Sequence, residues 1–210
     1  MSDLHTHLTY VDAMKLDLPE INQEGVVVTK FEVSEEDAKW SRIRALSDGR
    51  GRISAGTYTK LGIDGALWMS DTPDEMRDHS MPFYQAQRRG GRVLINGLGA
   101  GMVLGAMLKL NDVEHIDVVE TDERIVRLLG REYADPRVTI HYDDAFEIQW
   151  PVGTHWDVVW HDIWLDLTED NLPEMHRLHR KYGRRAEWQG SWGREFLEYQ
   201  KSRYRGFGGF

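Results

Sequence analysis

The 210-residue sequence contains no cysteine. That absence excludes disulfides, zinc sites built on thiolates and cysteine nucleophiles, and it fits a protein of the reducing cytoplasm. Long hydrophobic runs are also missing, because no stretch approaches the roughly 18 apolar residues that a membrane helix needs. Residues 1–10 lack the apolar segment of a secretion signal. We therefore expect a cytoplasmic protein with no membrane partner.

Basic residues are scarce relative to acidic ones, with 26 Lys and Arg against 35 Asp and Glu and a net charge of −9. This balance argues against a protein that coats nucleic acid. Residues 171–210 differ from the rest, because they hold 9 Lys and Arg but only 4 Asp and Glu. Such a basic segment is more often a solvated helical face than a site for an anionic partner. Nucleic acid is therefore not the expected partner, although this segment leaves it open.

The chain divides near residue 89 into two predicted domains. Residues 1–89 are predicted to form a β-rich region with a hairpin and two helices. A strand is expected over 25–33, and a helix capped by Ser34 follows it. The dipeptide Asp64-Gly65 between two apolar runs is typical of a type I′ hairpin turn. Thr72 and Pro73 indicate a further helix start, with Glu75 completing a capping box.

Residues 90–210 alternate short apolar strands with helices, a pattern typical of a parallel sheet covered on both faces. Strands are predicted over 92–96, 115–120, 137–141 and 156–161, with a further short strand over 185–189, and helices over 102–110, 122–132 and 192–205. Another helix is expected to be capped by Asn171, with Glu174 completing its capping box, and to end at Gly183.

A glycine turn follows the first of these strands. Gly97, Gly99 and Gly101 stand where a strand runs into a helix, so that a ligand can approach the backbone and the free N–H groups of the helix start. Glu120 ends the next strand, 23 residues after Gly97. A carboxylate there can accept both hydroxyls of a ribose. The pair predicts a nucleoside site.

The glycine spacing favours S-adenosylmethionine over a dinucleotide. The dinucleotide fingerprint needs its third glycine at position 102, where this chain has Met102. The G-x-G-x-G spacing with an acid at the end of the second strand resembles the class I S-adenosylmethionine-dependent methyltransferase superfamily. That resemblance implies an α/β, Rossmann-like class I methyltransferase fold. We expect it to be shortened at the C-terminus and preceded by a small hairpin-containing N-terminal region.

Within that superfamily, residues 61–162 most resemble the spermidine synthase family of aminopropyltransferases. The segments that carry this likeness are Leu61–Gly65, Asp74-Glu75 with His79, Val93–Ile95, Val119–Asp122, Asp135–Val138, Asp144 and Asp157–Asp162. The resemblance implies that the glycines and Glu120 bind the cofactor and that Asp144 and Ala145 meet its adenine.

The same resemblance places an acceptor pocket beside the cofactor. Asp162 ends a strand, where ligands of open α/β sheets bind, and its carboxylate can take a proton from an attacking amine. Asp78 and His79 fall at positions of the family's polyamine pocket. Trp164 is a candidate wall that would stack on a flat or cationic substrate, although core packing explains a tryptophan equally well. A capping or loop role is the alternative for Asp162.

Three departures separate the chain from the family pattern. Ala100 replaces the acid of the glycine turn, Asp78 and Ser80 replace a tyrosine and a glutamate, and Leu165 replaces an acid three residues after Asp162. Because polyamine cations need carboxylates at defined distances, these losses change the amine pocket. Ala100 also removes a charge that would repel the carboxylate of S-adenosylmethionine.

The sequence therefore predicts an S-adenosylmethionine-dependent methyltransferase that acts on a small-molecule acceptor. One alternative is an aminopropyltransferase with an altered amine pocket, which uses decarboxylated S-adenosylmethionine. The other is a non-catalytic nucleoside-binding or interaction module. No metal is expected. A homodimer through the hairpin or an open sheet edge is compatible with all three readings.

Overall fold

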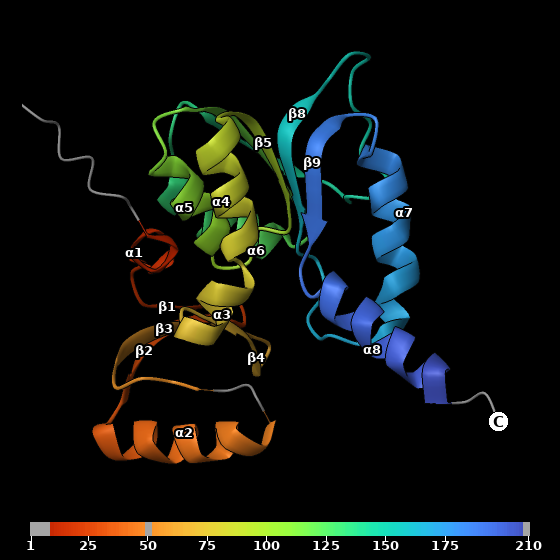
Figure 1. The fold of residues 1–210 in the computed structure, drawn as a ribbon. Helices are drawn as coiled ribbons and strands as arrows, with labels where there is room; N and C mark the ends of the chain where they lie inside the picture. The colour runs from red at the N-terminus through yellow and green to blue at the C-terminus, as the bar shows by residue number, and fades with distance from the viewer. Residues whose placement is uncertain (1–8, 49–51, 208–210) are drawn as a thin grey trace, which may run out of the picture.

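The computed structural model describes residues 9–48 and 52–207. The segment 1–8, on which the absence of a secretion signal partly rests, lies outside the described residues. Two sheets organise the described chain (Figure 1). One is antiparallel, with the strand order β1-β2-β3-β4, and the other is parallel, with the order β7-β6-β5-β8-β9.

The antiparallel sheet and four helices form the first part of the described chain. Its elements are α1 (Tyr10–Met14), β1 (Ile21–Gln23), β2 (Val26–Val33), α2 (Glu35–Asp48), β3 (Gly56–Ile63), β4 (Ala66–Ser70), α3 (Pro73–Asp78) and α4 (Ser80–Arg89). The sequence predicted only two helices here. It missed the short α1 and also α4, whose buried residues are Pro82, Phe83 and Ala86 and which packs against the parallel sheet and α5.

Two type I′ turns close the hairpins of this sheet. Asp64 and Gly65 have φ angles of 52° and 83°, which confirms the predicted turn, and Glu24 and Gly25 have 52° and 80°. The predicted capping box at α3 is wrong, although the helix does begin at Pro73. Thr72 accepts a hydrogen bond from the Ser70 hydroxyl instead of capping the helix.

The second part of the chain builds the parallel sheet. Its elements are β5 (Gly91–Asn96), α5 (Met102–Leu108), β6 (Val113–Glu120), α6 (Glu123–Leu128), the 3₁₀ turn η1 (Gly130–Tyr133), β7 (Val138–Tyr142), β8 (Trp156–His161), η2 (Glu169–Asn171), α7 (Leu172–Tyr182), β9 (Ala186–Ser191) and α8 (Arg194–Phe207). All of its neighbouring strands are parallel. The predicted α/β class is confirmed, and the strand order is that of a Rossmann-like methyltransferase fold.

The start of α7 differs from the prediction in its capping chemistry. The Asn171 side chain makes no cap bond to α7 and instead pairs reciprocally with Thr168 around η2. Glu174 is likewise not part of a capping box, because its carboxylate accepts the indole N–H of Trp164 at 2.9 Å. Asn171 is therefore used by the local turn before α7, and Glu174 by a contact with a residue ten positions earlier.

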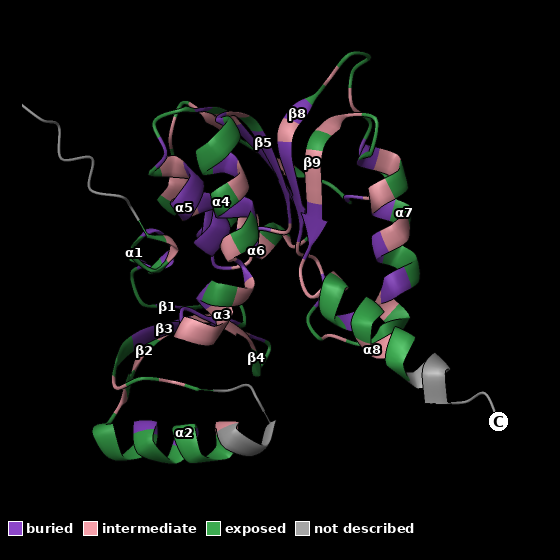
Figure 2. Ribbon diagram, viewed as in Figure 1, coloured by how far each residue is buried: buried purple, intermediate pink, exposed green. Residues whose placement is uncertain are grey.

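Helices cover both faces of the parallel sheet: α4, α5 and α6 lie on one face and α7 lies on the other (Figure 1). One buried cluster joins the two parts of the chain, because Leu61 of β3 and Phe83 of α4 belong to the same core as Val93 of β5. Figure 2 shows buried strands at the centre and a largely exposed α2 below the antiparallel sheet. The domain boundary at residue 89 stays a prediction. None of the helices in the described part of the chain is long and apolar enough to span a membrane.

Candidate functional site

A cavity of about 440 Å³ lies at the carboxyl ends of the parallel strands, and β4 of the antiparallel sheet contributes to its wall. Five carboxylates line it: Glu75, Glu120, Asp143, Asp144 and Asp162. Four aromatic side chains also line it: Trp68, Phe146, Trp164 and Trp192. The position agrees with the general rule that ligands of open α/β sheets bind beyond the carboxyl ends of the strands.

The glycine turn packs closely on the end of β8. Gly97 and Gly99 line the cavity, whereas Gly101 caps α5 outside the lining. Gly97 has a φ of 100°, and a Cβ there would lie 2.0 Å from the carbonyl oxygen of Asp162. A side chain at this position would therefore push the turn away from the strand end that carries Asp162.

A thioether from β4 contacts the same turn. The Ala100 N–H donates to Sδ of Met69 at 3.1 Å, and the Ala100 carbonyl accepts from the Tyr133 hydroxyl at 2.6 Å. Met69 and Trp68 both line the cavity, and the sequence gave no indication of either. Their contribution depends on how the hairpin docks, which local patterns do not specify.

Glu120 is buried at the end of β6 and held by backbone donors. Its carboxylate accepts the N–H groups of Leu98 at 2.9 Å, Thr121 at 2.7 Å and Asp122 at 2.9 Å. A carboxylate has about four lone-pair sites, so three backbone donors leave capacity for a further hydroxyl. The backbone thus fixes the orientation of the side chain that the sequence assigns to the ribose.

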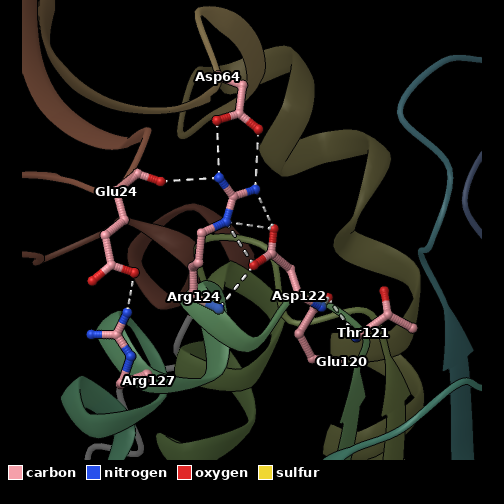
Figure 3. Close-up of polar contacts among 7 residues, drawn as sticks. All are labelled: Glu24, Asp64, Glu120, Thr121, Asp122, Arg124 and Arg127. Atoms are coloured by element: carbon pink, nitrogen blue, oxygen red, sulfur yellow. Dashed lines mark hydrogen bonds and ion pairs between the residues drawn. The ribbon is translucent and has the colours of Figure 1, made fainter.

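Arg124 links this strand end to the two type I′ turns (Figure 3). Its guanidinium donates to both carboxylate oxygens of Asp64, at 2.9 and 3.1 Å, and to the Glu24 carbonyl at 3.0 Å. It also donates to Asp122, at 2.7 Å for the shortest contact. Asp122 follows Glu120 by two residues in the chain. The contacts of Arg124 therefore hold the turns of the antiparallel sheet next to the candidate ribose site.

The end of β7 supplies the other candidate nucleoside contacts. Asp144 and Ala145 line the cavity, and the Asp144 carboxylate accepts the Phe146 N–H at 2.7 Å. Phe146 is partly buried and provides an apolar wall. Carboxylates at two adjacent strand ends, with apolar walls between them, suit the hydroxyls, amino group and flat ring of an adenosine. The residues present therefore fit the nucleoside that the resemblance implies.

Asp162 forms an ion pair with His79 on the other side of the cavity. Asp162 Oδ2 lies 2.8 Å from Nε2 of His79, whose Nδ1 contacts the Glu75 carbonyl at 2.8 Å. Burial alone would lower the pKa of His79, but the charge and hydrogen bond of Asp162 outweigh it and raise the pKa to about 9. Trp192 stacks on the imidazole, with ring centres 5.9 Å apart. At neutral pH the Asp162 carboxylate therefore faces an imidazolium.

The remaining acceptor-side residues differ in their placement. Glu75 lines the cavity, and burial raises its pKa even though the Ser70 N–H and hydroxyl bind the carboxylate. Trp164 lines the cavity and also belongs to a buried core cluster, and its indole N–H donates to Glu174. Asp78 ends α3 outside the cavity lining. The sequence assigned Glu75 to a capping box and to a motif of the family likeness, but gave it no role at the cavity.

Residues 75–173 match the family model described as the spermine/spermidine synthase domain. Over this segment the chain is similar to spermine/spermidine synthase domains. It begins in α3 and ends at the start of α7, so it includes Glu75, His79, the glycine turn and Asp162. Trp68, Met69 and Trp192 contribute to the cavity from outside the matched segment.

Curated relatives of the chain carry the name polyamine aminopropyltransferase. One, from Prochlorococcus marinus (strain MIT 9515), is 31% identical over 109 residues, which cover 47% of this chain and 38% of the relative. Polyamine aminopropyltransferase 2 of Ralstonia nicotianae is 34% identical over 145 residues, which cover 58% of this chain and 28% of the relative. The chain therefore spans well under half of the length of these relatives.

Among solved structures, spermidine synthase from Thermotoga maritima overlaps with a TM-score of 0.41 and 23% identity, over 54% of this chain and 42% of the other. The N-methyltransferase NodS from Bradyrhizobium japonicum overlaps with a TM-score of 0.43 and 10% identity, over 53% and 62%.

Proposed function

We propose that this chain is a transferase that moves an aminopropyl group from decarboxylated S-adenosylmethionine to an amine. One observation carries the proposal: the nucleoside-side carboxylates Glu120 and Asp144 open into the same cavity as the acceptor-side carboxylate Asp162. The likeness to the synthase domain and the names of the chain's relatives support aminopropyl transfer better than methyl transfer. A cytoplasmic location is part of the proposal.

The reaction asks mainly for orientation, because a sulfonium is a good leaving group. The unprotonated amine nitrogen attacks the aminopropyl carbon bonded to sulfur, a C–N bond forms, that C–S bond breaks and its electron pair stays on sulfur, which leaves as methylthioadenosine. Glu120 and Asp144 would hold the nucleoside, and Asp162 would accept a hydrogen bond from the amine. The proton that the amine loses would pass to a carboxylate that faces the cavity, Asp162 or Glu75.

Methyl transfer from S-adenosylmethionine is the second candidate, and the glycine turn favours it. The two residues between the glycines are Leu98 and Ala100, both buried and uncharged. S-adenosylmethionine carries a carboxylate that its decarboxylated form lacks. Neither Leu98 nor Ala100 has a negative charge that would repel this carboxylate.

Calorimetric titration of the full chain separates these candidates. The ligands are S-adenosylmethionine, its decarboxylated form and methylthioadenosine, each also titrated into Glu120→Gln. We expect micromolar binding of the decarboxylated form, weakened about tenfold or more in the variant because a carboxylate that binds hydroxyls is lost. The matched control is Glu114→Gln, an exposed acid on the same strand and away from the cavity.

Each outcome has a distinct meaning. Tighter binding of S-adenosylmethionine than of its decarboxylated form would favour methyl transfer over aminopropyl transfer. Failure of all three ligands to bind a folded protein would overturn both readings and favour a non-catalytic interaction module. Equal weakening by Glu114→Gln and Glu120→Gln would show that the effect is not local to the site.

A further inference from the structure

Two consecutive residues of β4 face the same cavity. Trp68 and Met69 both line it, although neighbouring side chains of a regular strand point to opposite faces. In the register of this hairpin, Leu61 of β3 lies opposite Met69. The next residue of β3, Gly62, lies opposite Leu67, so β4 contains an extra residue at this point. Such a β-bulge re-aims side chains, and here it directs Met69 at the cavity.

The Met69 thioether covers the glycine turn. Its Sδ accepts the Ala100 N–H at 3.1 Å, and a Cβ on Gly99 would lie 2.8 Å from the same sulfur. Gly99 and Met69 line the cavity, whereas Ala100 is buried and does not. The thioether therefore shields the Ala100 N–H from the cavity. Because a thioether is a weak acceptor, this donor is held by an uncharged group that binds it only weakly.

Most other N–H groups of the turn are not available to a ligand. Three of them already donate to carbonyl or carboxylate oxygens of the protein, those of Gly97, Leu98 and Gly101. Among the described residues, none accepts the Gly99 N–H. The turn therefore has two consecutive N–H groups that a ligand could use, those of Gly99 and Ala100. Consecutive backbone N–H groups suit an anion such as a carboxylate, but Met69 occupies the second of them.

The strand order places this turn beside the reactive part of the donor. β5 lies between β6, which ends at Glu120, and β8, which Asp162 follows. Neighbouring strand ends are about 5 Å apart across a sheet. A donor whose ribose meets Glu120 and whose sulfur faces Asp162 therefore crosses the glycine turn. The chain attached to that sulfur then starts next to the turn that Met69 covers.

This attached chain is the part in which the two candidate donors differ. S-adenosylmethionine carries a carboxylate on it, and the decarboxylated form does not. A carboxylate that leaves water needs charge-assisted hydrogen bonds, because an unpaired buried charge is costly. Met69 withholds one of the two usable N–H groups, and its own side chain offers no donor. An aminopropyl chain has no such need and can pack against the thioether.

We infer that Met69 selects the donor: by covering the N–H pair of Gly99 and Ala100, it disfavours the carboxylate of S-adenosylmethionine relative to the decarboxylated form. This inference rests on the proposed transferase function and names a residue that determines its donor specificity. The turn itself carries no charge that would repel the carboxylate, since its side chains are those of Leu98 and Ala100. The discrimination is therefore assigned to a neutral side chain of β4.

The test is calorimetric titration of the full chain and of Met69→Ala with S-adenosylmethionine, its decarboxylated form and methylthioadenosine. We expect the wild type to bind the decarboxylated form at least about tenfold more tightly than S-adenosylmethionine. In Met69→Ala the ratio of these two Kd values should fall about tenfold through tighter binding of S-adenosylmethionine, because the Ala100 N–H becomes available to the carboxylate. Methylthioadenosine lacks the attached chain, so its Kd should change less than about threefold.

Three further variants separate this covering role from general packing. Met69→Leu removes the sulfur but keeps an apolar side chain of similar volume over the turn, so it should retain the preference for the decarboxylated form. Met69→Val is a second shortened side chain with a high strand propensity, and it should shift the ratio in the same direction as Met69→Ala. Met81→Ala truncates an exposed methionine of α4 outside the cavity lining and should leave all three Kd values unchanged.

The outcomes distinguish this inference from the function on which it rests. A wild type that binds both donors equally would overturn the inference, and so would a ratio that stays constant in Met69→Ala and Met69→Val. A ratio that falls only through weaker binding of the decarboxylated form would also overturn it, as would an equal fall in Met69→Leu or Met81→Ala. Nucleoside binding stands in each of these cases. Failure of methylthioadenosine to bind the folded wild type would overturn the proposed function itself.

Discussion

The ion pair of His79 and Asp162 makes stability depend on pH in a definite direction. The pKa of His79 is raised from 6.5 to about 9, so the folded state holds a proton that the unfolded chain releases earlier. The stabilisation is complete below about pH 6.5 and disappears as the pH rises through about 9. From the size of the shift it amounts to at most about 3 kcal/mol.

Removing the Asp162 carboxylate should remove this dependence of stability on pH. Urea unfolding of the wild type and of Asp162→Asn at about pH 6 and about pH 10 is expected to show a difference in unfolding free energy that shrinks at the higher pH. Asp166→Asn is the control, because Asp166 is exposed and outside the cavity lining. If the unfolding free energies of the wild type and of Asp162→Asn changed with pH in parallel, the ion pair of His79 and Asp162 would be contradicted.

Gly97 and Gly153 give a matched pair of substitutions at the residue scale. Both have positive φ, at 100° and 87°, but a Cβ on Gly153 meets no atom within 4 Å, whereas one on Gly97 meets the Asp162 carbonyl. Gly153→Ala is expected to cost about 1 kcal/mol from conformation alone, and Gly97→Ala about 3 kcal/mol or more. Chemical denaturation measures both. Equal costs would mean that the close approach at Gly97 contributes nothing.

At the scale of elements, Arg124 joins the hairpin turns to the start of α6. Arg124→Met breaks its contacts with Asp64 and Asp122 and should loosen the segment that carries Glu120. We expect nucleoside affinity to fall by less than about tenfold, because Glu120 keeps its own backbone donors. Partial recovery is expected in Arg124→Lys, which keeps the charge without the planar fork.

Titration calorimetry of methylthioadenosine at low and high salt measures this effect. The loss should shrink as salt rises, since the contacts with Asp64 are largely exposed. Arg131→Met is the control, because Arg131 pairs with the adjacent Glu132 and contacts no hairpin turn in the described structure. An equal loss in the two methionine variants would argue against a specific link.

The elements that sequence predicted well are those with local causes. The Asp64-Gly65 turn needs two positive φ angles, and β8 has the predicted bounds 156–161 because its apolar run is buried on both faces. The capping roles of Thr72 and Asn171 failed because a polar neighbour in the same turn, Ser70 or Thr168, binds these side chains instead. Met69 was missed because its contact with Ala100 depends on how the hairpin docks on the glycine turn.

At the scale of the whole molecule, the two sheets share one core across the predicted boundary at residue 89. We therefore expect a single cooperative unfolding transition, with coincident curves from far-ultraviolet circular dichroism and tryptophan fluorescence. The eight tryptophans lie in both parts of the chain, so the fluorescence reports on both. Two separated transitions would indicate that residues 1–89 unfold independently.

The contact between Met69 and the glycine turn has an evolutionary consequence. A Cβ on Gly99 would lie 2.8 Å from Sδ of Met69, the flexible end of that side chain. A shorter residue at position 69 would free this space and leave the Ala100 N–H without its present acceptor. Positions 69, 99 and 100 should therefore change together during divergence, although position 69 lies in β4 and the other two lie in the turn after β5. A set of orthologues would show them as a covarying group, with the hairpin and the glycine turn inherited as one unit.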